Sequence, residues 1–190
     1  FFHACGMTIM EGYGQTEVSC FCTLCTPDAY RFGSVGKALP GVALKTDEDG
    51  EILVKGDIVF PGYHNQPELN AKILTGDGWI RTGDLGRIDD DGYLWITGRK
   101  KDIIITSGGK NVTPSNIEHL IMRHALIEHA MVHGDRRKYL TALISLSPEN
   151  LKEFGKARGY TDSDHEALTR LPEVTAAVQR AVDEANAHLA

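Results

Sequence analysis

The residues Gly41-Val42-Ala43-Leu44-Lys45 are followed by Asp49-Gly50 and then by Glu51-Ile52-Leu53-Val54-Lys55-Gly56. Two short apolar runs joined by Asp-Gly predict a β-hairpin, because this dipeptide accepts the positive φ angles that tight hairpin turns need. Asp91-Gly92 before Tyr93-Leu94-Trp95-Ile96 repeats the signal. Several short strands joined by glycine turns predict a small antiparallel barrel or sheet over residues 33–97.

The residue pattern changes after Gly98. Thr113-Pro114 and Ser147-Pro148-Glu149 each predict a helix start, with a hydroxyl side chain as N-cap and a proline in the first turn. Strands outside the barrel region are predicted at Met7–Met10, 102–106, Ile127–Gly134 and Tyr139–Leu146. We therefore expect an α+β fold, in which residues 1–98 hold an antiparallel β-barrel-like segment and residues 99–190 form a small C-terminal α+β domain.

The C-terminal tail has the periodicity of an amphipathic helix. Ser163 and Glu166 form a capping-box pattern. After Pro172, apolar residues recur at intervals of one, three and four residues: Val174, Ala177, Val178, Ala181, Val182, Ala185 and Leu189. We expect this stripe to pack on its own domain rather than to bind a partner protein.

Length and composition exclude several classes of protein. The 190 residues, 42% of them hydrophobic, suit one medium domain or two small ones. A net charge of −6 and the lack of a long basic block argue against nucleic-acid binding. The longest apolar runs, such as Ile103-Ile104-Ile105, are too short to span a bilayer, so we expect no transmembrane segment. Because the sequence opens Phe1-Phe2 without an initiating Met, we expect it to be part of a longer protein.

The four cysteines, Cys5, Cys20, Cys22 and Cys25, all lie near the N-terminus. No second ligand pair follows them at the spacing of a zinc finger, so the pattern does not favour a metal site. We expect small buried side chains instead, in a reducing, intracellular setting.

Two acidic runs have the appearance of calcium loops, Asp47-Glu48-Asp49-Gly50 and Asp89-Asp90-Asp91-Gly92. With the glycine at loop position six, position one would be Lys45 or Arg87, and a cationic side chain cannot bind Ca²⁺. We therefore interpret both runs as hairpin turns.

Three polar stretches carry side chains suited to a nucleotide. The loop Tyr13-Gly14-Gln15-Thr16-Glu17 offers a ring that can stack on a base, a hydroxyl for a phosphate and a carboxylate for Mg²⁺. In Thr82-Gly83-Asp84, the carboxylate after a glycine turn suits two ribose hydroxyls. In Gly98-Arg99-Lys100-Lys101-Asp102, the guanidinium is a fixed fork of donors for ribose or phosphate oxygens. Taken singly, each stretch is also compatible with an ordinary surface turn.

In this order, the three stretches resemble the later motifs of the adenylate-forming acyl-CoA synthetase superfamily. The resemblance implies that Tyr13 packs on adenine, that Thr16 bonds a phosphate and that Glu17 binds Mg²⁺. It further implies that Asp84 binds the ribose and that Arg99 binds the nucleotide. Thr16 and Glu17 are thus the expected catalytic residues, and ATP and Mg²⁺ are the expected cofactors.

The same resemblance assigns roles beyond Arg99. Lys101 corresponds to the hinge about which the small C-terminal domain of the family rotates as a mobile lid. The stretch Ser107-Gly108-Gly109-Lys110 corresponds to a loop that lines the pantetheine tunnel after rotation. Ser107, Gly108 and Lys110 are therefore expected to contact coenzyme A, a substrate, and paired glycines would let the backbone approach this narrow ligand.

Residues 99–114 and the helical segment 148–190 look most like bacterial long-chain fatty-acid–CoA ligases. We therefore expect the C-terminal part of an enzyme that forms acyl-AMP from ATP and a fatty acid, and then acyl-CoA. The expected partners are fatty acid, ATP and CoA, the expected location is the cytoplasm, and peripheral membrane association of the parent is left open. The alternatives are a fatty-acyl-AMP ligase, an amino-acid-activating or other adenylate-forming enzyme, or a non-catalytic interaction module derived from the lid.

We expect the 190-residue chain by itself to have no adenylation activity. The family's Ser/Thr/Gly-rich phosphate loop and its adenylation lysine have no counterpart in this sequence, and groups that act as a unit lose most of their effect when some are missing. ATP–pyrophosphate exchange by the purified chain should equal that of a buffer control. Exchange above this background would contradict the expectation.

Overall fold

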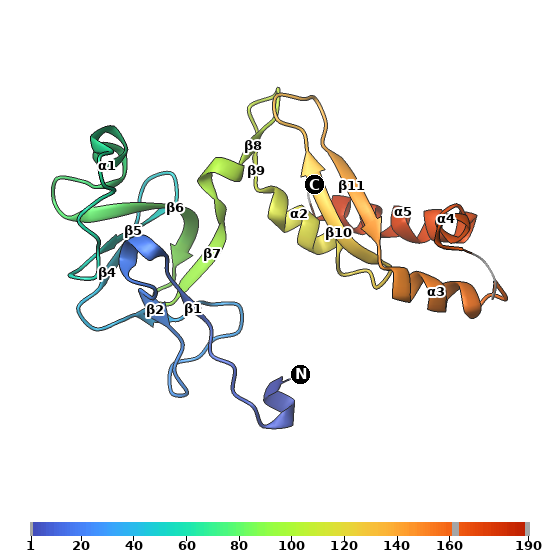
Figure 1. The fold of residues 1–190 in the computed structure, drawn as a ribbon, viewed down its shortest axis with the longest axis horizontal. Helices are drawn as coiled ribbons and strands as arrows, with labels where there is room; N and C mark the ends of the chain where they lie inside the picture. Colours follow the sequence, from blue (N-terminus) through green and yellow to red (C-terminus); the bar gives the residue numbers. More distant parts are fainter. Residues whose placement is uncertain (1, 161–163, 189–190) are drawn as a thin grey trace. The chain divides into compact units, whose positions relative to one another are not determined.

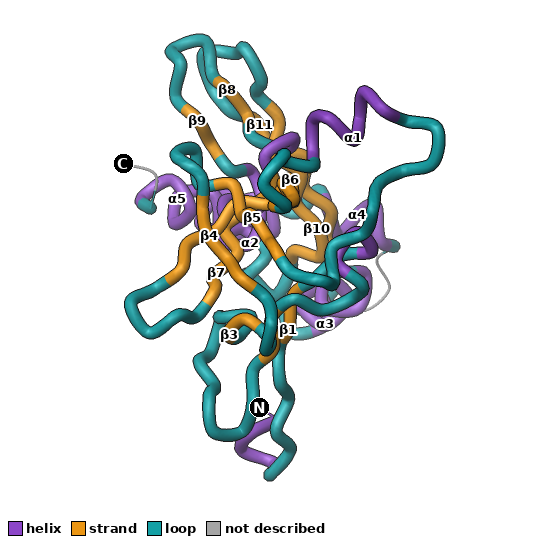
Figure 2. Tube along the Cα trace, turned by 90° about the vertical axis from the view of Figure 1, so that its left-hand side faces the viewer, coloured by secondary structure: helices purple, strands orange, loops and turns teal. Residues whose placement is uncertain are grey.

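The computed structural model describes residues 2–160 and 164–188. The chain divides into two compact units, Phe1–Lys101 (unit 1) and Asp102–Ala190 (unit 2). Within the described residues, unit 1 consists mainly of strands and loops, whereas unit 2 combines short antiparallel sheets with helices (Figures 1 and 2). The predicted α+β fold class is confirmed.

Unit 1 contains a curled four-stranded antiparallel sheet with the strand order β4-β5-β6-β7 (Figure 1). The strands are β4 (Ala43–Thr46), β5 (Glu51–Lys55), β6 (Trp79–Ile88) and β7 (Leu94–Arg99). Both predicted hairpins are confirmed, because β4 pairs with β5 on either side of Asp49-Gly50 and β6 pairs with β7 on either side of Asp91-Gly92. The two acidic runs therefore lie in hairpin turns, as predicted.

The remaining elements of unit 1 are short. A second sheet has the order β1-β2-β3, and the other elements are helical. Their bounds are β1 (Gly12–Tyr13), β2 (Thr23–Leu24), β3 (Lys37–Ala38), α1 (Pro67–Ile73) and the 3-10 turns η1 (Phe2–Cys5), η2 (Thr16–Val18) and η3 (Lys100–Asp102). The strand predicted at Met7–Met10 is wrong, because these residues have no regular structure and their apolar side chains are exposed.

The core of unit 1 forms on the central strand β5 and its neighbours. Its fully or almost fully buried members are Val18, Cys22, Ile52, Val54, Ile80 and Leu94. Cys22 and Cys25 are buried, as expected for small apolar side chains, but Cys5 and Cys20 are exposed. The expectation of burial is wrong for these two, because Cys5 belongs to the exposed turn η1 and Cys20 to a sharp surface turn after η2.

Unit 2 pairs a β10–β11 hairpin with helices. Its elements are β8 (Ile104–Ile105), β9 (Asn111–Val112), α2 (Pro114–Ile121), β10 (Ile127–His133), β11 (Thr141–Leu146), α3 (Pro148–Lys156), α4 (His165–Thr169) and α5 (Pro172–Ala187). The strands predicted at Ile127–Gly134 and Tyr139–Leu146 are confirmed with shorter ends, whereas only Ile104–Ile105 of the run 102–106 is a strand. A turn, η3, occupies the start of that run.

The predicted helix starts are confirmed at two positions. The Ser147 hydroxyl accepts a hydrogen bond from the Asn150 amide at 3.4 Å, and Thr113 is the N-cap of α2, without a side-chain bond. The capping residue predicted at Ser163 lies outside the described residues. Asp164 is the N-cap of α4 and accepts from the Ala167 amide at 2.7 Å.

The apolar stripe of α5 packs within unit 2, as predicted. Ala181 and Ala185 share a buried cluster with Ile117 and Ile121 of α2. Val174 packs in a separate cluster with Leu151 and Leu168. Leu189 lies outside the described residues, and within them no helix is long and apolar enough to cross a membrane.

Candidate functional site

The carboxylate of Asp84 joins two other predicted site residues, Tyr13 and Arg99. It is buried, with 6% of Asp84 exposed, and one oxygen, Oδ2, accepts a hydrogen bond from the Tyr13 hydroxyl at 2.6 Å. The other oxygen, Oδ1, is paired with Nε of Arg99 at 3.0 Å. Strands β1, β6 and β7 thus bring Tyr13, Asp84 and Arg99 into one cluster, although they lie far apart in the sequence.

A bulge in β6 sets the position of Asp84. Leu53 of β5 pairs with Arg81 and Glu51 pairs with Leu85, so three residues of β6, Thr82–Asp84, lie opposite Ile52 alone. Gly83 has a φ of 73°, which a side-chain-bearing residue adopts only with strain. The Thr82 hydroxyl closes the bulge by accepting from the Asp84 amide at 3.1 Å and donating to the Ile52 carbonyl at 2.8 Å. Such bulges redirect a side chain, here towards Arg99 on the neighbouring strand.

The Tyr13 hydroxyl is a hydrogen-bond donor to this carboxylate and keeps its proton. Burial, and then the hydrogen bond to Asp84, raise the pKa of Tyr13 above its ordinary value. The thiol of Cys22 donates a hydrogen bond to the backbone carbonyl of Tyr13 at 3.4 Å. Burial raises the pKa of Cys22 to about 11, so this thiol is not a nucleophile at neutral pH.

Two cavities adjoin the cluster. One, of about 420 Å³, is lined by Gln15, Thr82, Gly83, Asp84, Arg99, Lys100 and Lys101. The other, of about 570 Å³, is lined by Gly12, Tyr13, Gly14, Gln15, Thr16, Ser19, Cys20 and Phe21. Gln15 lines both cavities, so the loop that carries Tyr13 and Thr16 borders the first cavity as well as the second. The first cavity is lined by three cationic side chains, those of residues 99–101, and by the carboxylate of Asp84.

The loop 13–20 is tightly constrained. A Cβ atom at Gly14 would lie 1.6 Å from the Cys20 carbonyl oxygen, so only glycine fits there. Ser19 and Cys20 have φ angles of 55° and 87°, which are uncommon for residues other than glycine. Backbone strain of this kind often accompanies functional loops. The segment after residue 57 supports the loop through the bond from the Ser19 hydroxyl to the Ile58 carbonyl at 2.9 Å.

Thr16 and Glu17 open the turn η2. Thr16 is exposed and Glu17 is half-buried. The Glu17 carboxylate accepts a hydrogen bond from the Tyr63 hydroxyl, and its backbone carbonyl accepts from the Phe60 amide at 2.9 Å. The hydrogen bond to Glu17 raises the pKa of Tyr63, so the phenol remains a donor.

The donor set at Glu17 fits a magnesium ion carried with a nucleotide. Within the described residues, no group of three or more His, Cys, Asp or Glu side chains is arranged to hold a metal. Mg²⁺ in nucleotide enzymes is typically held by one or two carboxylates, substrate phosphates and water. Glu17 is a partly exposed carboxylate beside a cavity, which is compatible with that mode of binding.

The predicted CoA contacts lie in unit 2, in the turn between β8 and β9. The Ser107 amide donates to the Arg137 carbonyl at 2.9 Å, and the Gly109 amide donates to the Thr106 carbonyl at 2.9 Å. Gly108 and Lys110 are exposed, and Gly109 has a φ of 78° with open space around it. Lys101, the predicted hinge, is exposed and is the last residue of unit 1.

Several side chains at the site were not predicted from the sequence. They are Gln15 and Lys100 in the cavity wall, Tyr63 on Glu17, and Glu51 and Arg81 beside the bulge. A signal existed for Glu51, which directly precedes the apolar run of β5 and is therefore placed at the start of a strand. No local signal pointed to Tyr63, because its contact spans 46 residues.

Two segments of the chain match known protein families. Residues 1–64 match the AMP-binding enzyme family, and residues 101–190 match the family of AMP-binding enzyme C-terminal domains. The chain belongs to the AMP-binding enzymes. Along the sequence, the β6–β7 hairpin, which carries Asp84 and Arg99, lies between the two matched segments.

Similar proteins include two fatty-acid ligases. The long-chain-fatty-acid–CoA ligase FadD15 of Mycobacterium bovis is 41% identical over 190 residues, which is 98% of this chain and 31% of FadD15. The long-chain-fatty-acid–CoA ligase ACSBG1 of Rattus norvegicus is 40% identical over 152 residues, 77% of this chain and 21% of ACSBG1. The chain therefore spans about a third or less of the length of these relatives.

A solved structure shares the fold. O-succinylbenzoate coenzyme A synthetase (MenE) from Bacillus subtilis, in complex with ATP and a magnesium ion, has a TM-score of 0.69 at 31% identity. The match covers 84% of this chain and 37% of the synthetase.

We expect Tyr13 to stay protonated at about pH 11, where an ordinary tyrosine is mostly ionised. The substitution Tyr13→Phe should therefore leave the tyrosinate absorbance of the folded chain unchanged at that pH, with circular dichroism confirming that both proteins are folded. In denaturant, where the contact with Asp84 is lost, the variant should show one tyrosinate fewer. A deficit already present in the folded chain would mean that Tyr13 ionises normally and is not held by Asp84.

Proposed function

We propose that this chain is part of an ATP-dependent, AMP-forming ligase that makes the CoA thioester of a long-chain fatty acid. The observation that carries the proposal is the Tyr13–Asp84–Arg99 cluster beside a cation-rich cavity, in a chain 41% identical along its length to a long-chain-fatty-acid–CoA ligase. The similarity to FadD15 and ACSBG1 supports the substrate class, and the cluster supports nucleotide binding.

The nucleotide would bind to unit 1. A carboxylate has about four lone-pair sites, and Asp84 uses one on the Tyr13 hydroxyl and one on Arg99, so two remain for the hydroxyls of a ribose. The ring of Tyr13, whose hydroxyl is fixed, faces a cavity with room for a base to stack. Arg99 and the neighbouring lysines of the cavity wall favour the negative charge of phosphates.

The proposed chemistry has two steps. The fatty-acid carboxylate attacks the α-phosphorus of ATP, the bond to the leaving pyrophosphate breaks, and acyl-AMP forms. The CoA thiol then loses its proton and attacks the acyl carbonyl, and AMP leaves. Mg²⁺ would neutralise phosphate charge when bound at Glu17, and Thr16 would donate a hydrogen bond to a phosphate oxygen. The residues of this chain thus act by positioning and by charge neutralisation.

The second step would use unit 2 as a lid. We assign CoA contacts to Ser107, Gly108 and Lys110, because they form an exposed turn whose glycines leave open space for a narrow ligand. Lys101 would be the hinge, since it is the last residue of unit 1. A lid that turns between steps lets one cavity serve two reactions.

The proposal is tested on the whole protein that contains this chain, with ATP and a panel of fatty acids, in the presence and absence of CoA. Formation of acyl-CoA together with AMP and pyrophosphate is the expected result, strongest with long-chain acids. Release of acyl-AMP that CoA does not consume would instead indicate a fatty-acyl-AMP ligase. A protein that neither binds ATP nor consumes it would be a non-catalytic module.

In the whole protein, Asp84→Ala should weaken ATP binding by about 1.5–3 kcal/mol, the range for hydrogen bonds to a charged group. The exposed residue Asp90, in the hairpin at the far end of β6, offers a control, because Asp90→Ala removes a carboxylate without touching the cavity. Calorimetry with ATP measures both affinities. An unchanged affinity for Asp84→Ala would leave Asp84 as a structural residue only.

Lys101→Pro, in the whole protein, should impair one half-reaction far more than the other. Proline fixes φ near −65° and removes an amide donor, so it restricts the rotation that a hinge requires. We expect acyl-AMP formation to survive better than thioester formation from pre-made acyl-AMP, and Lys101→Ala to have a mild effect on both. Equal losses in the two half-reactions would reject Lys101 as the hinge.

A further inference from the structure

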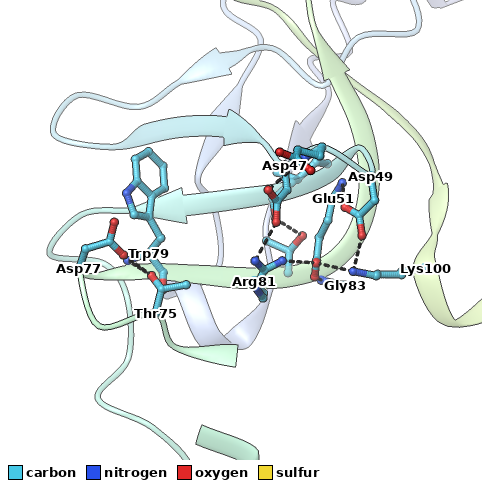
Figure 3. Close-up of polar contacts among 12 residues, drawn as sticks. Asp47, Asp49, Glu51, Thr75, Asp77, Trp79, Arg81, Gly83 and Lys100 are labelled. Atoms are coloured by element: carbon cyan, nitrogen blue, oxygen red, sulfur yellow. Dashed lines mark hydrogen bonds and ion pairs between the residues drawn. The ribbon is translucent and has the colours of Figure 1, made fainter. Parts of the chain in front are cut away.

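Glu51, the first residue of β5, is a buried carboxylate that contacts Arg81, Gly83 and Lys100 (Figure 3). It does not line the cavity of Asp84, but it lines a neighbouring cavity of about 280 Å³ together with Glu17 and Tyr63. Only 4% of Glu51 is exposed. Its Oε1 accepts from the Gly83 amide at 3.0 Å, and its Oε2 accepts from Nη1 of Arg81 at 2.9 Å and from Nζ of Lys100 at 2.9 Å. One side chain therefore contacts the β6 bulge and the residue that follows β7.

Two further carboxylates of the β4–β5 turn complete the network (Figure 3). Asp47 pairs with Nη2 of Arg81 at 2.7 Å, and Asp49 pairs with Nζ of Lys100 at 2.6 Å. Asp49 also accepts from the Glu51 amide at 3.1 Å, which fixes the start of β5. Three carboxylates thus hold two cations, and the hydrogen bonds lower the pKa values of Asp47 and Asp49.

The bulge needs this acceptor. Thr82–Asp84 lie opposite one residue of β5, so the Gly83 amide has no carbonyl partner on the neighbouring strand. A partly buried amide without an acceptor costs free energy, and the Glu51 carboxylate supplies the missing bond. Because Asp84 follows Gly83 directly, the position of Glu51 bears on the position of the Asp84 carboxylate.

The same carboxylate also holds the end of unit 1. Arg99, paired with Asp84, is followed by Lys100, which is tied to Glu51 and Asp49, and then by Lys101, where unit 1 ends. Two parts of the cavity wall, the bulge and the segment 99–100, are thus attached to a single buried side chain. The Glu51 carboxylate is buried, whereas the Lys100 side chain is 44% exposed, so removing Lys100 leaves a buried charge with only Arg81 and the Gly83 amide as partners.

We propose that Glu51 and Lys100 form a positioning pair that locks Asp84 and Arg99 in one geometry and holds the chain up to Lys100, next to the proposed hinge at Lys101. Neither Glu51 nor Asp49 lines the cavity of Asp84, so their influence on Asp84 and Arg99 passes through Gly83 and Lys100. The part of this proposal that concerns ATP and the lid rests on the proposed function. The part that concerns Gly83 and Lys100 does not.

The first test measures amide hydrogen exchange on the 190-residue chain without any ligand. In Glu51→Gln and in Lys100→Met, we expect exchange to become about ten-fold faster in peptides covering 82–86 and 98–102, with other peptides of unit 1 unchanged. The matched controls are Glu48→Gln, an exposed carboxylate of the same hairpin, and Lys55→Met, an exposed lysine at the end of β5. Unchanged exchange in these two peptides, or a loss of protection throughout unit 1 in both variants, overturns the proposal.

The second test uses the whole protein. Glu51→Gln should raise the KM for ATP by about ten-fold or more, while the step from pre-made acyl-AMP to acyl-CoA loses less. The effects of Glu51→Gln and Lys100→Met should be non-additive in the double variant, because they remove the same contact. Additive effects would overturn the pairing. If the wild-type protein makes no acyl-AMP, the proposed function fails, and the exchange experiment still decides whether Glu51 positions the bulge.

Discussion

Three residues of β6 lie opposite one residue of β5, and the candidate site depends on this mismatch. The extra length lifts Thr82, Gly83 and Asp84 out of the regular ladder, so that two backbone amides need acceptors other than strand carbonyls. A hydroxyl and a buried carboxylate supply them. The bulge also leaves Asp84 directly opposite Arg99 in the β6–β7 pair. In a regular strand, side chains alternate between the two faces of the sheet, and the bulge breaks this alternation before Asp84.

Acidic hairpins play a structural part in unit 1. The β4–β5 turn binds Arg81 and Lys100, and the β6–β7 turn binds Arg31 through Asp89 and Asp91. Burial raises the pKa of Asp89, but the Tyr93 amide, the Trp95 indole and Arg31 outweigh it and lower that pKa to about 2. The two acidic runs that resemble calcium loops, 47–49 and 89–91, therefore form ion pairs that join the hairpin turns to Arg and Lys side chains elsewhere in unit 1.

The proposed binding residues differ in how firmly the fold holds them. Tyr13, Asp84 and Arg99 belong to paired strands, and the Asp84 carboxylate contacts both of the other two side chains. The fold therefore sets their mutual geometry before any ligand arrives. The turn that carries Ser107, Gly108 and Lys110 is exposed. A preorganised cluster and an exposed turn suit the two-step ligase that we propose.

The sequence by itself determined the local elements and the types of chemical group. Asp-Gly turns and the Thr-Pro and Ser-Pro helix starts depend on φ preferences and capping, which act over a few residues, so both hairpins and the starts of α2 and α3 were predictable. The strand at Met7–Met10 failed because apolar composition cannot reveal a missing pairing partner. Only the tertiary structure decided that Tyr63 bonds to Glu17 and that Glu51 joins Gly83 to Lys100, because these contacts span 32 to 49 residues. Those of Glu51 also depend on the register of β5 against β6.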